Sequence, residues 1–86
     1  MGAPRQEPRQ ALYRVVAQAL QVDAGRISPQ ASPETIPSWD SLRSILLVTA
    51  VEERYQVQFT LVQMMAIRTV GDLEAALAHH GIALDG

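Results

Sequence analysis

Apolar residues recur at helical spacing near the start of the chain. Pro8 suits the first turn of a helix, where its missing N–H is not needed. The apolar side chains after it fall at i, i+3, i+4, i+7 and i+8, which makes one stripe of an amphipathic helix: Leu12, Val15, Val16, Ala19 and Leu20. We therefore expect a first helix that begins near Pro8 and follows a polar, disordered tail over residues 1–7.

The helical spacing breaks between residues 21 and 39. Three prolines, a glycine and several serines interrupt this stretch. A connection of this length is uncommon in a compact small domain and is often functional. Three large apolar residues are expected to anchor it to the core: Ile27, Ile36 and Trp39.

Capping residues mark the starts of two further helices. Asp40 is a good N-cap for a second helix that runs to about Tyr55. Thr60 and Gln63 have the spacing of a capping box, in which each side chain accepts a backbone N–H of the other residue. This box predicts a short third helix with these apolar residues: Leu61, Val62, Met64, Met65 and Ile67.

Thr69 and Asp72 can cap a fourth helix. Its apolar face consists of Leu73, Ala76 and Leu77. Gly81 can end this helix, and residues 81–86 then form a C-terminal tail. Because no stretch alternates like a strand, we predict an all-α four-helix bundle with a long first loop and a short third helix.

The second helix has two apolar stripes, whereas a surface helix of a small domain needs only one. One stripe is an ordinary core face: Leu47, Val48, Val51 and Tyr55. The other lies on roughly the opposite side: Leu42, Ile45, Leu46 and Thr49. Either the long loop covers this second stripe or a partner docks on it. We favour a partner, because four short helices can hardly bury both faces of one of them.

Length and composition narrow the possible functions. Eighty-six residues make one domain, and without cysteine its stability must come from the hydrophobic core. The residues are 48% hydrophobic but only 5% aromatic, so this core must be mostly aliphatic. The formal net charge of −2 is far from the basic balance that favours nucleic acid as a partner.

Membrane insertion and export are not expected. No segment approaches the roughly 20 apolar residues that span a bilayer. The first residues lack the apolar stretch of a signal peptide. We therefore expect a cytoplasmic protein.

Ser41 lies where the proline-rich loop becomes the second helix. Its hydroxyl falls in the first turn, near free backbone N–H groups and the positive end of the helix dipole. These surroundings favour an attached phosphate group. On local chemistry alone, however, an ordinary helix start is the better explanation of Asp40 and Ser41.

Asp40-Ser41-Leu42 opens the second helix and Glu52-Glu53-x-Tyr55 closes it, with apolar residues at regular spacing between them. Val57-Gln-Phe59 and Ile67-Arg-Thr-Val-Gly-Asp-Leu73 follow at fitting distances. This arrangement resembles the acyl carrier protein family over residues 8–80, which are thereby identified as a carrier domain. The resemblance implies a four-helix bundle of acyl-carrier type.

The resemblance also implies a function without catalysis. Ser41 would receive a 4′-phosphopantetheine arm from coenzyme A, added by a separate phosphopantetheinyl transferase, and Asp40 would cap the helix and contact that transferase. The thiol of the arm would hold an acyl or aminoacyl group as a thioester. The chain, a monomer, would present this group to loading enzymes and downstream synthase or transferase enzymes.

Two further sets of residues acquire roles through the resemblance. A docking face for partner enzymes would consist of Leu42, Arg43, Ile45, Leu46 and Thr49. A cleft for the carried group would be lined by Met64, Met65 and Ile67. For these last three residues we favour core packing over the cleft.

The chain departs from the carriers of fatty acid synthesis at three positions. Arg43 and Leu46 stand where acidic residues are common on the exposed face of this helix. Trp39 precedes Asp40, in place of the glycine-leucine pair of fatty-acid carriers or the paired glycines of peptidyl carriers. These departures favour a discrete carrier of a specialised pathway, such as a polyketide, hybrid or amino-acid loading system.

Other interpretations have less support. His79 and His80 point about 100° apart on a helix, which makes a poor metal pair. No glycine-rich oxyanion loop accompanies Ser41, so a hydrolase triad is not indicated. The open alternative is a helical adaptor that binds partners non-covalently through the second apolar stripe and is never modified at Ser41.

Overall fold

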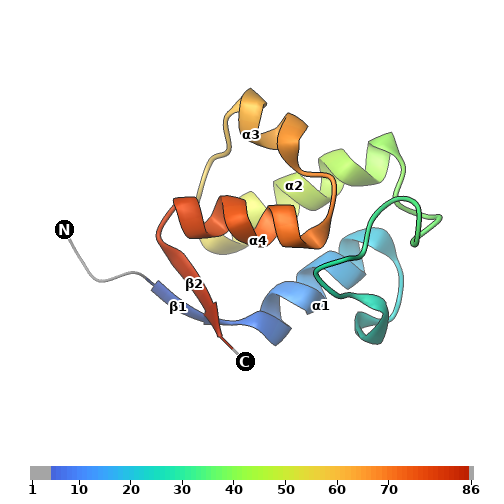
Figure 1. Cartoon of the computed structure of the whole chain (residues 1–86), viewed down its shortest axis with the longest axis horizontal. Helices are drawn as coiled ribbons and strands as arrows, with labels where there is room; N and C mark the ends of the chain where they lie inside the picture. The colour runs from blue at the N-terminus through green and yellow to red at the C-terminus, as the bar shows by residue number, and fades with distance from the viewer. Residues whose placement is uncertain (1–4, 86) are drawn as a thin grey trace.

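The computed structural model describes residues 5–85 and confirms the predicted four-helix fold (Figure 1). The helices are α1 (Arg9–Leu20), α2 (Ser41–Tyr55), α3 (Leu61–Ala66) and α4 (Val70–His79), with one short 3-10 helix, η1 (Ala24–Arg26), in the first loop. As predicted, that loop is long and α3 is short. Within the described residues no helix is long and apolar enough to cross a bilayer.

The predicted caps form at the starts of α2, α3 and α4. The Asp40 carboxylate accepts the backbone N–H of Arg43 at 2.9 Å. Thr60 and Gln63 form a complete capping box, and Thr69 and Asp72 form another. Each cap satisfies a donor that the first helical turn leaves without a partner. Local sequence therefore fixes where each of these helices begins.

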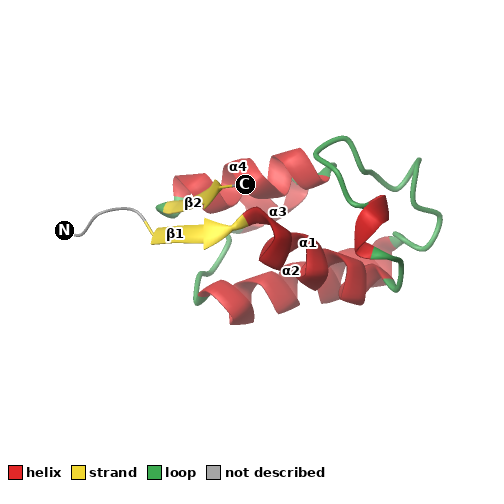
Figure 2. Ribbon diagram, turned by 90° about the horizontal axis from the view of Figure 1, so that it is seen from below, coloured by secondary structure: helices red, strands yellow, loops and turns green. Residues whose placement is uncertain are grey.

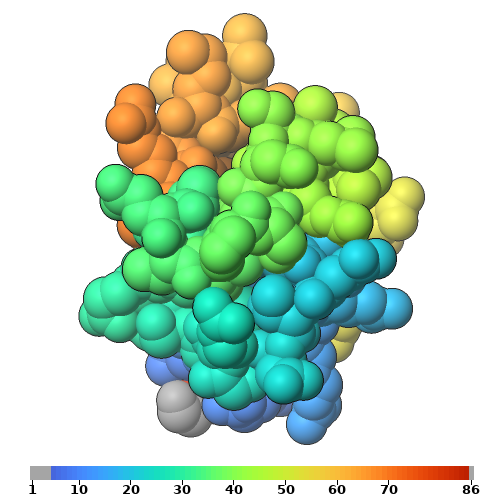
Figure 3. All heavy atoms as spheres, turned by 90° about the vertical axis from the view of Figure 1, so that its right-hand side faces the viewer, coloured from blue at the N-terminus to red at the C-terminus, as the bar shows by residue number. Residues whose placement is uncertain are grey.

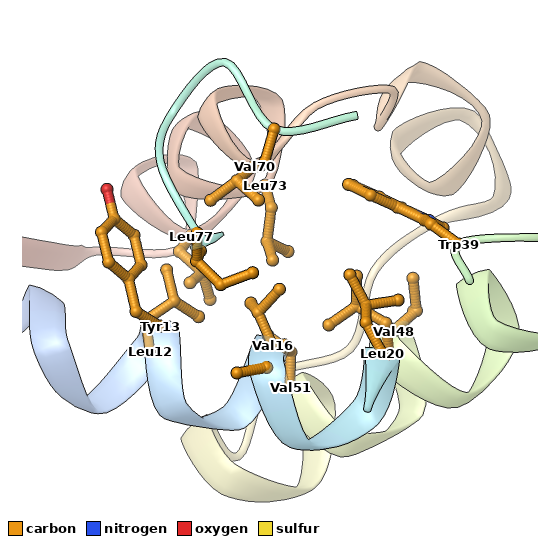
Figure 4. Packing of buried hydrophobic residues seen from close by; sticks show 14 of the residues in the cluster. Leu12, Tyr13, Val16, Leu20, Trp39, Val48, Val51, Val70, Leu73 and Leu77 are labelled. Carbon is orange, nitrogen blue, oxygen red and sulfur yellow. The ribbon is translucent and has the colours of Figure 1, made fainter. Parts of the chain in front are cut away.

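The core lies between α1, α2 and α4 (Figure 4). Ile27, Ile36 and Trp39 are all buried in it, which confirms that they anchor the long loop. On α1 the buried face is rotated slightly from the predicted stripe. Tyr13 and Ala17 are buried beside Leu12, Val16 and Leu20, whereas Val15 and Ala19 are only partly buried.

Two short strands differ from the expectation of tails at both ends. Arg5–Pro8 (β1) pairs in parallel with Ile82–Asp85 (β2), and Arg5 stands opposite Ile82 (Figure 2). Ile82 is buried in the core, and the Arg5 guanidinium donates to the Tyr55 carbonyl at the end of α2. The expected disorder is therefore wrong for residues 5–7, because long-range pairing orders them. Residues 1–4 and 86 lie outside the described part of the chain.

The strand pair and the start of α2 lie at opposite ends of the molecule. Figure 2 shows β1 and β2 at one end and the long loop that leads into α2 at the other. Ser41, the first residue of α2, follows this loop directly. The region around Ser41 is thus far from the paired chain ends.

Candidate functional site

Ser41 is the first residue of α2 and its side chain is exposed. Asp40 before it is the N-cap, and its carboxylate and carbonyl accept the N–H groups of Arg43 and Ser44. Within residues 5–85, the Ser41 hydroxyl and the backbone N–H groups of Ser41 and Leu42 form no hydrogen bond. A free hydroxyl therefore stands beside two free N–H donors.

This arrangement fits an attached phosphate. The free N–H groups lie at the positive end of the α2 dipole, which stabilises negative charge in the first turn. Because the hydroxyl has no partner among the described residues, its substitution breaks no hydrogen bond of the fold. An exposed position also leaves room for a modifying enzyme. Ser41 is thus chemically suited to carry a phosphodiester-linked group.

The segment around Ser41 is fixed by its neighbours in the chain. Trp39 is 4% exposed and faces the cluster around Val48 and Leu20 (Figure 4). Its indole N–H donates to the Ser44 hydroxyl at 2.8 Å. The Ser38 hydroxyl donates to the Leu20 carbonyl at 2.6 Å. The sequence indicated Trp39 as a core anchor and as a departure from fatty-acid carriers, but neither Ser38 nor Ser44 was predicted to hold this segment.

Arg43 lies on α2 but is turned away from the expected docking face. Its guanidinium donates to the Ala19 carbonyl at 3.3 Å and to the Gln21 side-chain carbonyl at 3.2 Å. Ala19 lies in the last turn of α1, where carbonyl groups lack helical partners and a cation is favourable. Arg43 therefore joins the end of α1 to the start of α2.

The second apolar stripe of α2 is uncovered. Leu42 and Ile45 are each 64% exposed, Leu46 is 44% exposed, and Thr49 is exposed as well. The interpretation that the long loop covers this stripe is therefore wrong. The first stripe packs in the core as predicted, with Leu47, Val48, Val51 and Tyr55 all buried.

A groove of about 310 Å³ separates α2 from α3. Its lining is mainly apolar and comes from both helices: Ser44, Ile45, Val48, Thr49, Glu52, Leu61, Met64 and Met65. Met65 is 69% exposed and Met64 is also exposed, so the favoured core packing of these two residues is wrong. Both belong to α3, a helix that buries none of its six residues and so does not contribute side chains to the core.

Ile67 does not line this groove. It ends α3 and faces a second hollow of about 360 Å³ between α3 and α4, beside Ala66 and Ala76. Leu61, in contrast, was not predicted to line the groove, although it stands four residues before Met65 on the same side of α3. That spacing was the signal that could have identified it.

His79 and His80 lie at the end of α4. The His80 ring contacts the Phe59 ring at 5.4 Å between centroids, and its Nε2 lies 3.2 Å from the Gln63 side-chain oxygen. No cluster of three potential metal ligands occurs among the described residues. These contacts connect α4 to α3.

Comparisons with known proteins agree with this geometry. The family model described as the phosphopantetheine attachment site matches residues 10–77. The acyl carrier protein MbtL of Mycolicibacterium paratuberculosis is 32% identical over 77 residues, which cover 90% of this chain and 86% of that protein.

Two solved structures share the fold. The holo acyl carrier protein of Geobacter metallireducens has a TM-score of 0.72 and 28% identity, over 80% of this chain and 79% of that one. A proposed acyl carrier protein of Mycobacterium tuberculosis has a TM-score of 0.73 and 24% identity, over 83% and 95%. At this lower identity the second structure supports the fold alone. The chain therefore belongs to the acyl carrier protein family, whose members are not enzymes but carry 4′-phosphopantetheine for partner enzymes.

Proposed function

We propose that Ser41 is the attachment residue for 4′-phosphopantetheine. The observation that carries this proposal is exposure, because Ser41 is the one exposed serine among residues 5–85. The other four are partly buried: Ser28, Ser32, Ser38 and Ser44. Three of these also take part in hydrogen bonds that hold turns or the loop, namely Ser32, Ser38 and Ser44.

Asp40 and the start of α2 prepare Ser41 for modification. Asp40 closes the first turn through the Arg43 N–H and leaves its exposed side available to a phosphopantetheinyl transferase. The free N–H groups of Ser41 and Leu42 stabilise the negative charge of the new phosphodiester. When attached, the arm supplies a thiol that holds an acyl or aminoacyl group as a thioester.

The exposed stripe of α2 is the proposed docking face. It directly follows Ser41, so a partner that contacts Leu42, Ile45, Leu46 and Thr49 is placed close to the attachment point. Arg43 supports this face indirectly, because its contacts with α1 hold the first turn of α2. A loading enzyme and a downstream synthase or transferase would use the same face in turn.

The groove between α2 and α3 is the proposed shelter for the carried group. Met64 and Met65 line one wall and Ile45 and Val48 the other, so an apolar acyl chain is the cargo that this lining favours. Ile67 is not part of this proposal, because it faces the other side of α3.

The pathway is proposed to be a specialised one in the cytoplasm, such as polyketide, hybrid or amino-acid loading biosynthesis. The support comes from the docking face. Leu46 is exposed and apolar, and Arg43 is directed to α1, so neither position offers the acidic group common in carriers of fatty acid synthesis. Electrostatic complementarity mainly sets partner choice and encounter rate, so a different charge pattern favours different partners.

The test is intact-protein mass spectrometry after incubation with coenzyme A and each of several phosphopantetheinyl transferases. We expect the wild-type mass to rise by one phosphopantetheine group with at least one transferase. Ser41→Ala should show no rise, while the control Ser28→Ala, at a serine in the preceding loop, is modified like the wild type. No modification by any transferase would refute the carrier role and favour a non-covalent adaptor.

A further inference from the structure

A further hollow lies between the first loop, the start of α2 and the connection from α3 to α4. We call it the loop hollow, and its volume is about 530 Å³. Three segments line it: residues 30–34 of the loop, Trp39 together with Ser44, and residues 67–69. In Figure 3 these segments meet on the face toward the viewer, with the loop in green, the end of α3 in orange and the start of α2 in yellow-green.

The loop hollow is within reach of a group attached to Ser41. Trp39 and Ser44 both line it, two residues before Ser41 and three residues after it. Residues three apart on a helix are neighbours on its surface, so Ser44 lies one turn along α2 from Ser41. Ser44 also lines the groove between α2 and α3. A flexible chain attached at Ser41 can therefore enter either the groove or the loop hollow.

Backbone hydrogen bonds hold two walls of the loop hollow together. The Val70 N–H at the start of α4 donates to the Ala31 carbonyl of the loop at 3.0 Å. The next N–H, of Gly71, donates to the Pro29 carbonyl at 2.9 Å. A Cβ at Gly71 would lie only 3.1 Å from that Pro29 oxygen, so glycine permits the close approach. The loop hollow is thus formed before any ligand enters, which lowers the cost of binding.

Two charged side chains of opposite sign line the loop hollow from different walls. Arg68 belongs to the connection between α3 and α4, and Glu34 belongs to the loop. Within residues 5–85, neither side chain forms an ion pair or a hydrogen bond, and the Gln30 amide of the loop wall is also free. Trp39 and Ile67 add apolar surface. The lining therefore offers donors, acceptors and apolar contacts, and its formal charges cancel.

This lining fits a neutral ligand with amide groups better than an anion or a hydrocarbon chain. A phosphate or carboxylate would be attracted by Arg68 but repelled by Glu34. A hydrocarbon chain would remove water from both charges and replace none of its hydrogen bonds. An amide group, in contrast, has a carbonyl that accepts from a guanidinium and an N–H that donates to a carboxylate. The pantetheine part of the arm is an uncharged segment with two amides, a hydroxyl and a pair of geminal methyl groups.

We propose that the loop hollow is a binding site for the pantetheine part of the arm while the arm carries no acyl group. Arg68 donates to an amide carbonyl of the arm and Glu34 accepts an amide N–H, while Trp39 and Ile67 contact the geminal methyl groups. This inference rests on the proposed function, because the arm is attached to Ser41. It goes beyond that function in assigning the unloaded arm a site of its own, separate from the groove that shelters the carried group.

The first test is nuclear magnetic resonance of the modified wild-type protein. Isotope-labelled protein receives an unlabelled arm from coenzyme A, and a filtered Overhauser experiment detects protons of the arm that lie close to protons of the protein. We expect contacts from the geminal methyl groups to Ile67 and to Trp39, whose indole signal is unambiguous because the chain has one tryptophan. Contacts to Leu61 and Met65 instead, or no contacts at all, would overturn the proposal.

The second test compares two double variants. Glu34→Ala with Arg68→Ala removes both charges from the loop hollow and should abolish the contacts of the arm. Glu53→Ala with Arg14→Ala removes one acid and one base at exposed positions outside the loop hollow and should retain the contacts. Circular dichroism should show wild-type helicity for both variants. Contacts that persist without Glu34 and Arg68, or that vanish in both double variants, would contradict the proposed roles of these two residues.

The two proposals fail in distinguishable ways. An arm that no transferase attaches to Ser41 would refute the proposed function itself. An attached arm that makes no contact with the loop hollow would refute only the inference about its binding site. The intact mass of the resonance sample shows which of the two cases applies.

Discussion

At the scale of the residue, the reactive hydroxyl and the groups that fix its position belong to different side chains. Trp39 is buried and bonded to Ser44, and Asp40 between them closes the first turn of α2. The Ser41 hydroxyl itself forms no hydrogen bond within residues 5–85. The segment can therefore be well ordered while the hydroxyl stays available for reaction.

The cap at Asp40 gives a prediction on stability. Asp40→Ala should lower the free energy of unfolding by about 1 kcal/mol, because the Arg43 N–H loses its acceptor. Asp40→Asn retains a capping oxygen and should lose much less. Thermal unfolding followed by circular dichroism measures both. Equal losses of unfolding free energy for the two variants would show that Asp40 stabilises the protein through its negative charge and not through its capping hydrogen bond.

The bond between Trp39 and Ser44 can be measured by a double-mutant cycle. Trp39→Phe and Ser44→Ala each remove one partner, and the coupling energy should be about 0.5–1.5 kcal/mol, as for other hydrogen bonds. Chemical denaturation gives the four free energies of unfolding. Strictly additive effects would mean that this bond does not hold the start of α2.

The sequence predicted Ser41 and Asp40 because both roles depend on local position in a helix. It did not predict the direction of Arg43, whose partners Ala19 and Gln21 are more than 20 residues away. The path of the long loop brings the end of α1 beside the start of α2, and no local sequence pattern predicts this long-range contact.

At the scale of the element, α2 combines a buried face with an exposed apolar one. Leu46 and Leu47 are adjacent in the sequence, yet Leu46 is 44% and Leu47 is 1% exposed. One face therefore serves the fold, and the other is free for a partner. The helical spacing predicted both faces, because successive residues of a helix point about 100° apart.

This pair of leucines offers a matched test. Leu46→Glu should change the melting temperature little, because the side chain at this position is exposed to water. It should weaken binding to partner enzymes, because it places a charge on the proposed docking face. Leu47→Glu should cost about 3–5 kcal/mol or prevent folding, since it buries a charge in the core and removes a packed side chain. Thermal melts of both variants decide the point. A large loss of stability for Leu46→Glu would place Leu46 in the core.

The short helix α3 shows where spacing alone fails. Its capping box was predicted and is present, but the expected burial of Met64 and Met65 was wrong. Phe59 and Ile67, on either side of α3, pack on the core, whereas none of the six residues of α3 is buried. Apolar residues on so short a helix indicate an apolar face. Only the fold shows whether that face is buried in the core or exposed.

At the scale of the whole molecule, the chain ends close the bundle. β1 pairs with β2, and the Arg5 guanidinium reaches the Tyr55 carbonyl at the end of α2. Glu7 of β1 also forms an ion pair with Arg54 at 3.8 Å. Each strand has only four residues, too few to show an alternating pattern, and their pairing joins opposite ends of the sequence. These strands therefore could not be predicted from local signals.

The contribution of β2 can be tested at Ile82. Ile82→Ala should lower the free energy of unfolding by about 2–4 kcal/mol, because a fully buried side chain leaves a cavity in the core. Asp85→Ala, at an exposed position of the same strand, should have little effect. Urea denaturation compares the two. A negligible loss for Ile82→Ala would mean that β2 does not belong to the folded domain.

The attachment of phosphopantetheine to Ser41 is the central claim, and peptide mapping of the modified protein tests it most directly. Trypsin cleaves after Arg26 and Arg43, so residues 27–43 form one peptide that contains Ser28, Ser32, Ser38 and Ser41, while Ser44 falls in the next. Fragmentation of these peptides by tandem mass spectrometry then locates the group. The structure predicts that it lies on Ser41 alone. A group found on any other serine would contradict the account.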